Sequence, residues 1–208
     1  MKFIVGTKTG MTQVFDEAGT CRAATVLKVD PAVVSQVKTP EKDGYTAILL
    51  ASGTQKEHRL KKAQKGQFGS AAIAREFRPD SGQEAVVANL AKGTAVDVSA
   101  FTPGDTITVS AVSKGKGFQG VVKRHGFEGG RRSHGQKHSE REAGSIGGGG
   151  RAGGRVAKNM RMAGRMGGDT ITVKNLTVLQ VNKDENVLIV SGAIPGRKGT
   201  LVEVYSAK

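Results

Sequence analysis

Residues 106–120 read TITVSAVSKGKGFQG, and the character of the chain changes in the middle of this stretch. Up to Val112 the residues are β-prone and mostly alternate between polar and apolar, which indicates a strand with one buried face. From Ser113 to Gly168 the chain instead has 17 glycines in 56 residues, with 13 lysines and arginines against 3 glutamates. The alternation of polar and apolar residues resumes from Thr170 to Val181. The sequence therefore predicts a strand on each side of a long glycine- and arginine-rich insertion.

The two flanks of this insertion have an ordinary globular composition. They carry 19 basic and 15 acidic groups, so that +10 of the chain's net charge of +14 lies in the insertion. From Phe3 to Leu50, short β-prone runs are separated by turn residues, and Asp43-Gly44 is a hairpin signal. Many short strands with frequent turns favour a small barrel over a parallel sheet.

We therefore predict a mainly β fold, namely a β-barrel body with minor α content and a long non-globular extension inserted between strands. Residues 1–112 form the N-terminal part of the barrel, with a short α-containing insertion at about 55–95. Residues 113–168 form the basic extension, and residues 169–208 supply the strands that complete the barrel.

The net charge of +14, with a pI near 10.1, favours a polyanionic partner. The longest apolar run, Ala47 to Ala51, is too short to span a bilayer, and the first residues contain no signal-peptide pattern. A single cysteine, Cys21, excludes an internal disulfide framework and a cysteine-rich zinc site. We expect a cytoplasmic chain that binds neither a membrane nor a small-molecule substrate.

Glycine and arginine together suit an RNA partner. Arginine neutralises phosphates, binds them in bidentate fashion and stacks on unpaired bases, and glycine lets the backbone approach a phosphate chain closely. The insertion has too few apolar side chains to fold alone, so we expect it to be extended and mobile without RNA. A solvated linker is the alternative, although linkers seldom carry such a charge. The expected RNA contacts are Lys114, Lys116, Lys123, Arg124, His125, Arg131, Arg132, His134, Lys137, His138, Arg141, Ser145, Arg151, Arg155, Lys158, Arg161 and Arg165.

Other chemistry in the insertion is less well supported. The run Gly147–Gly150 follows no apolar strand and opens no apolar helix, which disfavours a dinucleotide-binding loop. His134 and His138 have a spacing that could chelate a metal, but Gly135 between them and the want of cysteine ligands favour contact with phosphate or base. We therefore expect no metal, no cofactor and no catalytic residue.

The insertion has two aromatic residues, Phe118 and Phe127. We interpret them as apolar anchors at the root of the extension, with stacking on an RNA base as the lesser alternative. His125, Glu140 and Ser145 could be combined into a hydrolase set, but no strand–turn–helix frame supports that interpretation.

Residues 113–127, SKGKGFQGVVKRHGF, closely resemble the bacterial form of the ribosomal protein L-three family. The resemblance continues in the same order along nearly the whole chain, at 6–15, 133–136, 144–147, 162–167 and 192–196. The chain departs from the family's pattern within the extension, at Ala143, Gly153, Ala157 and Asn159.

This resemblance implies a structural constituent of the large ribosomal subunit, a ribonucleoprotein component in translation and not an enzyme. It implies direct binding to 23S rRNA near its 3′ end, a nucleating role in early subunit assembly, and an extension that reaches towards the peptidyl transferase centre. The expected tip is Gly147, Gly148, Gly149 and Gly150. The neighbouring proteins L-thirteen, L-fourteen, L-seventeen and L-nineteen are the expected protein partners. A free RNA chaperone or nucleoid-type protein is the alternative that charge alone leaves open.

Overall fold

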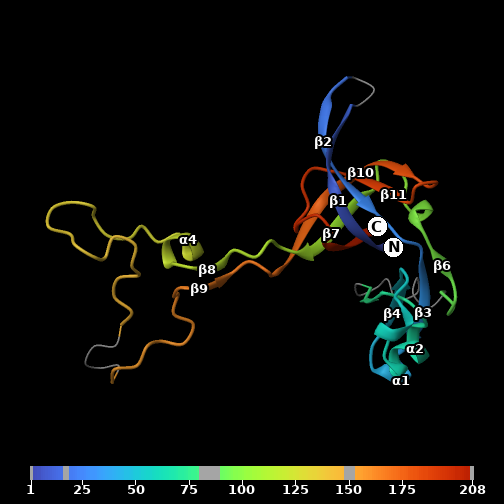
Figure 1. The fold of residues 1–208 in the computed structure, drawn as a ribbon, viewed down its shortest axis with the longest axis horizontal. Helices are drawn as coiled ribbons and strands as arrows, with labels where there is room; N and C mark the ends of the chain where they lie inside the picture. The colour runs from blue at the N-terminus through green and yellow to red at the C-terminus, as the bar shows by residue number, and fades with distance from the viewer. Residues whose placement is uncertain (1, 16–18, 80–89, 148–152, 207–208) are drawn as a thin grey trace. The chain divides into compact units, whose positions relative to one another are not determined.

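The computed structural model describes residues 2–15, 19–79, 90–147 and 153–206, and its fold is drawn in Figure 1. The chain divides into two compact units. The first contains Met1–Val112 together with Thr170–Lys208, and the second is Ser113–Asp169. Strands predominate and the helices are short, which confirms the prediction of a mainly β fold with minor helix.

Six antiparallel strands of the first unit close into a barrel, in the order β1, β12, β7, β10, β11, β2. They are β1 (Phe3–Phe15), β2 (Cys21–Lys28), β7 (Thr106–Val112), β10 (Thr170–Asn182), β11 (Val187–Ser191) and β12 (Leu201–Ser206). Closure joins the two ends of the chain, because Phe3 of β1 lies opposite Tyr205 of β12. The strands on each side of the insertion are neighbours, with Val112 opposite Thr170.

The barrel is filled by aliphatic side chains that point inward at every second position of its strands. Every strand contributes at least one such buried residue, among them Ile4, Leu27, Val109, Val178, Leu188 and Val204. Register shifts interrupt the two longest strands, between Lys8 and Gly10 in β1 and between Val173 and Leu176 in β10. Such bulges increase the local bend and twist of a strand. Along β1, residues Phe3 to Thr7 pair with β12, and residues Thr7 to Phe15 pair with β2.

A second sheet of the same unit has the strand order β5, β4, β3, β6. Its strands are β3 (Ala32–Lys38), β4 (Ala47–Ser52), β5 (Ile73–Phe77) and β6 (Ala95–Val96). Strands β3 and β4 form a hairpin, as the Asp-Gly signal predicts, but the connection includes the short helix α1 (Pro40–Asp43), ended by Gly44 at φ 79°. Both strands pair within this sheet and are not among the strands of the barrel.

A second hydrophobic cluster packs this sheet against the outer side of the barrel strand β1. Phe3 and Val5 of β1 join Val34, Ile48 and Leu50, while Ile4 between them lies inside the barrel. The rings of Phe3 and Phe77 stack with their centroids 4.4 Å apart. Both faces of β1 are covered at this point, which explains why the first four residues of the strand are all buried.

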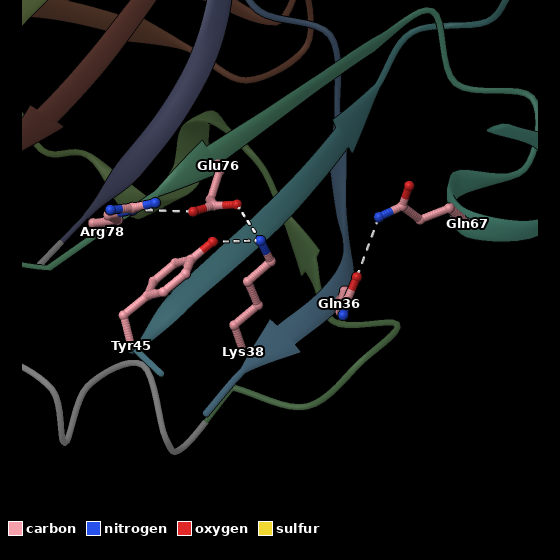
Figure 2. Close-up of polar contacts among 6 residues, drawn as sticks. All are labelled: Gln36, Lys38, Tyr45, Gln67, Glu76 and Arg78. Carbon is pink, nitrogen blue, oxygen red and sulfur yellow. Dashed lines mark hydrogen bonds and ion pairs between the residues drawn. The ribbon is translucent and has the colours of Figure 1, made fainter. Parts of the chain in front are cut away.

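Polar side chains near the ends of β3 and β5 are joined by hydrogen bonds, as Figure 2 shows. Lys38 Nζ donates to Tyr45 Oη and to Glu76 Oε2, each at 2.6 Å. Arg78 Nε donates to Glu76 Oε1 at 3.1 Å, and its guanidinium lies 3.9 Å from the centroid of the Tyr45 ring. The cluster combines two cations with one carboxylate and stabilises this edge of the sheet.

Between the strands of this sheet lie η1 (Glu57–Arg59) and α2 (Lys62–Phe68), and η2 (Val98–Ala100) leads back towards the barrel. The backbone N–H of Gln55 donates to the carbonyl of Ser70 at 2.8 Å, which closes the base of the loop that carries η1 and α2. Ser35 Oγ donates to the Gln67 carbonyl, and the side-chain amides of Gln36 and Gln67 are in contact at 3.3 Å (Figure 2). The loop is thereby fixed to β3.

Candidate nucleic-acid interface

The base of the second unit is a two-stranded ribbon formed by β8 (Gly117–Gln119) and β9 (Gly164–Met166), with the short helix α4 (Val121–His125) after β8. The N–H of Ser113 donates to the Asp169 carbonyl at 2.8 Å, and the N–H of Lys116 donates to Met166 at 2.9 Å. These bonds hold the beginning and the end of the insertion together. Val121 is the one buried hydrophobic residue in the described part of this unit.

Several glycines of this unit are required by its own backbone. A Cβ on Gly167, which has φ 72°, would lie 2.3 Å from the carbonyl oxygen of Lys114. A Cβ on Gly129, at φ 80°, would lie 2.1 Å from the carbonyl oxygen of Glu140. No L side chain fits such a position without moving the backbone. The sequence argument that glycine serves close approach to phosphate therefore misses this second reason, which is close approach of the protein to itself.

The predicted RNA-contacting side chains lie at the surface. Of the seventeen, sixteen fall within the described residues, and all of these are exposed except His125, which is half-buried; Arg151 lies outside the described residues. Among them, Arg132 is the one paired with a carboxylate in the part of the unit that the structure describes, through Nε and Glu140 Oε1 at 2.7 Å. The other exposed cations have no carboxylate partner there. The unit therefore presents a concentrated positive charge.

Two of the predicted contacts also hold the unit together. Arg124 Nη1 donates to the carbonyl of Met162 at 2.7 Å, and His125 Nε2 lies 2.9 Å from the same oxygen. Both residues come from α4, so these bonds join that helix to the segment before β9. Gly164 leaves room for the Arg124 guanidinium, because a Cβ there would lie 2.5 Å from Nη1.

The two aromatic residues of the unit have different surroundings. Phe127 is half-buried, with the Arg161 guanidinium 5.3 Å and the His125 ring 6.0 Å from its centroid. This agrees with an anchoring role. Phe118 is 77% exposed, the highest value among the large apolar side chains that the structure describes. The interpretation of Phe118 as a buried apolar anchor is therefore wrong, because most of its side chain remains exposed.

The expected tip falls largely outside the described residues. Gly147 is exposed at φ 80°, and its N–H donates to Ser145 Oγ at 3.3 Å. Gly148, Gly149 and Gly150 lie outside the described ranges. His134, one half of the possible metal pair, has φ 59°. No group of three or more His, Cys, Asp or Glu side chains within the described residues is placed to hold a metal ion.

The first unit carries a second group of exposed cations, to which the sequence alone gave no predicted function. Between residues 56 and 65 the chain has five lysines and arginines against one glutamate, and all five are exposed. They are Lys56, Arg59, Lys61, Lys62 and Lys65. Lys65 pairs with Glu57 at 2.5 Å, and the segment is carried by the loop that is fixed to β3. The density of lysine in the sequence was the available signal.

Within the part of the chain that the structure describes, none of the helices has both the length and the apolar character needed to cross a membrane.

Comparison with known proteins gives a consistent result across both units. The family described as ribosomal protein L3 matches residues 54–193. The large ribosomal subunit protein uL3 of Acidothermus cellulolyticus is 44% identical over 207 residues, which cover 100% of this chain and 93% of the relative. That of Chlorobium phaeobacteroides is 42% identical over 209 residues, covering 100% of each chain. That of a Roseiflexus species is 47% identical over 208 residues, covering 98% of this chain and 96% of the relative.

Proposed function

Because this chain belongs to the ribosomal protein L3 family, we propose that it is a structural constituent of the large ribosomal subunit and binds 23S ribosomal RNA directly. Its relatives carry the name of a large-subunit protein, and their similarity covers nearly the full length of both chains. As a member of this family the chain is a structural component of the translation machinery in the cytoplasm, and not an enzyme.

One observation supports RNA binding most strongly. In the unit 113–169, fifteen of the sixteen described candidate residues are exposed, and only one cation is paired with a carboxylate in its described part. Unpaired cations repel one another, and a bound polyanion removes this repulsion. The counterions of the polyanion are released on binding, which favours the complex further. The ribbon of β8 and β9 supplies a fixed base for these side chains. We propose that this unit makes the main phosphate contacts.

The family resemblance supports finer proposals. Binding takes place near the 3′ end of 23S rRNA and nucleates early subunit assembly, and the insertion extends towards the peptidyl transferase centre with Gly147–Gly150 at its tip. The neighbouring proteins are L-thirteen, L-fourteen, L-seventeen and L-nineteen. The exposed, positive-φ backbone at Gly147 is compatible with close RNA approach.

The segment 56–65 supplies a second, smaller phosphate contact in this proposal. Its five exposed cations lie on a loop whose ends are joined by hydrogen bonding between Gln55 and Ser70. A surface that is ordered before binding loses less conformational entropy on contact with RNA. Its charge is less than that of the unit 113–169, so its contribution to affinity is expected to be smaller.

Two measurements test the function. Lysates are fractionated after a high-salt wash, and the protein is quantified against large subunits; a constituent stays at one copy per subunit, whereas a free RNA chaperone or nucleoid protein is washed off. The affinity of the purified protein for deproteinised 23S rRNA is then measured between about 50 and 200 mM salt. With roughly 6–10 phosphate contacts it should fall by about 10³–10⁵-fold. Loss from subunits in the wash, or an affinity that does not depend on salt, would contradict the proposal.

A further inference from the structure

The side chain of Phe118 is largely exposed, although its backbone is fixed by strand pairing. Phe118 is the central residue of β8, and its strand pairs with β9 through the positions Gly117 to Gln119. The hydrogen bond from the Lys116 N–H to the Met166 carbonyl, at 2.9 Å, continues the pairing on one side. The ring nevertheless remains 77% exposed. Because the ring is exposed while its backbone is ordered by strand pairing, its face is available to a partner without rearrangement of the ribbon.

A cation accompanies the ring on the same face of the ribbon. Arg165 of β9 lies directly opposite Phe118 in the antiparallel pairing, and directly opposed residues project to the same side of a sheet. Arg165 is exposed, and its guanidinium lies close to Gly168, where a Cβ would be 3.0 Å from Nη2. The aromatic side chain and the cationic side chain thus project from opposed positions on one face of the ribbon.

This pair fits a nucleotide better than a protein side chain. A base has a π face that stacks on an aromatic ring, and the adjoining phosphate binds a guanidinium. Lys114 and Lys116, which precede Phe118 in the chain, are exposed cations, and they favour a polyanion over an apolar protein surface. Phe127, by comparison, is half-buried, and the Arg161 guanidinium lies over its ring with 5.3 Å to the centroid.

We propose that Phe118 is a base-stacking residue, on whose ring an unpaired base of 23S rRNA stacks while Arg165 binds a phosphate of the same or the adjoining nucleotide. The proposal rests on the proposed function and deepens it, because it adds an uncharged contact to a surface otherwise described by charge. Stacking on aromatic residues is tolerant of base identity, so the contact contributes affinity and position more than sequence selection.

The absence of tryptophan from the chain makes a direct test possible, because a substituted tryptophan is the sole such reporter. Full-length Phe118→Trp is titrated with deproteinised 23S rRNA while tryptophan fluorescence is recorded. A stacked base should quench the emission at saturation. The matched control is Phe15→Trp, at a strand position of the first unit that is 62% exposed; its emission should change little.

Affinity measurements complete the test. Phe118→Ala should weaken RNA binding by about 5- to 150-fold, with the salt slope unchanged since no charge is removed. Phe118→Leu should be weakened similarly, while Phe118→Trp should bind like the wild type, because an aromatic face and not apolar bulk is required. Arg165→Met should lower the salt slope by about one.

Three results would overturn the stacking contact. They are unchanged emission of Phe118→Trp at saturating RNA, wild-type affinity of Phe118→Leu, and quenching that appears only after ribosomal proteins are added, which would identify a protein partner. In each case the wild type still binds RNA with its salt dependence, so the proposed function stands. If instead the wild type itself binds 23S rRNA weakly and without salt dependence, the proposed function fails as well.

Discussion

The barrel and the unit 113–169 are stabilised in different ways. In the barrel, every strand buries aliphatic side chains in a common interior. In the unit 113–169, Val121 is the one buried hydrophobic residue among those described, and the backbone is held by hydrogen bonds and by glycines that allow close approach. The first gains its stability by removing apolar surface from water. The second gains little in this way, because most of its described side chains are exposed.

The largest expected effect comes from separating the two units. Val112 lies opposite Thr170 in an antiparallel pair, so residues 113–169 can be replaced by the two-residue turn Asn-Gly. The barrel should remain folded, as judged by a cooperative thermal transition. Affinity for 23S rRNA should fall by at least about 10³-fold at low salt, and most of the salt dependence should disappear. An unchanged affinity and salt slope would show that the RNA contacts lie in the barrel unit.

The converse experiment removes a side chain from the barrel interior. Leu188 is fully buried, and Leu188→Ala should lower the free energy of unfolding by about 2–5 kcal/mol, because the cavity left behind is only partly filled. Denaturant unfolding measures this, and the RNA affinity of the folded variant should not change. The control is Ile171→Ala in β10, where the side chain is 44% exposed and a much smaller loss is expected.

A third change distinguishes the two roles of glycine. Gly167→Ala places a Cβ against the Lys114 carbonyl at a positive φ, so it should distort the base of the insertion and weaken RNA binding by roughly tenfold, with about 1 kcal/mol attributable to backbone strain alone. Gly115→Ala is the matched control, since no atom lies within 4 Å of its Cβ. Equal losses for both variants would show that the glycines serve the RNA and not the protein.

The smallest effect concerns the polar cluster of Figure 2 in the first unit. Hydrogen bonding to Glu76 raises the pKa of Lys38 to about 12. Partial burial opposes ionisation of Glu76, but the hydrogen bonds from Lys38, Tyr45 and Arg78 outweigh it and lower the pKa of Glu76 below 4.5. The stabilisation is therefore present near neutral pH, is lost as pH falls through the lowered pKa of Glu76, and is lost at high pH as Lys38 deprotonates.

Glu76→Gln tests this dependence. The variant should be less stable than the wild type near pH 7. The difference should shrink as pH falls from the ordinary pKa of 4.5 through the lowered pKa of Glu76, where the folded wild-type carboxylate is protonated as well. Denaturant unfolding between pH 3 and pH 8 measures the difference. A difference that stays constant over this range would mean that the cluster contributes through packing and not through charge.

The sequence by itself determined the class of the fold and located the two strands on each side of residues 113–169. Alternation at 106–112 and 170–181 located β7 and β10, and the change of composition at Ser113 coincides with the division into two units. The accumulation of arginine identified the candidate RNA-binding side chains, whose exposure the structure shows for all but His125 among those it describes. The strands could be located because periodicity is a local property of the chain, whereas the RNA-binding role of these side chains stays a prediction.

Only the tertiary structure decided which strands share a sheet and which side chains are left uncovered. In β4 every residue is buried, so no alternation marks a face, and the sequence could not show that β3 and β4 leave the barrel. Phe118 lies in β8 and Phe127 follows α4 shortly after it in the chain. The Phe118 side chain is largely exposed, whereas the Phe127 ring lies beneath the Arg161 guanidinium. The contact of Phe127 with Arg161 joins residues 34 positions apart in the sequence, so no local pattern could show it.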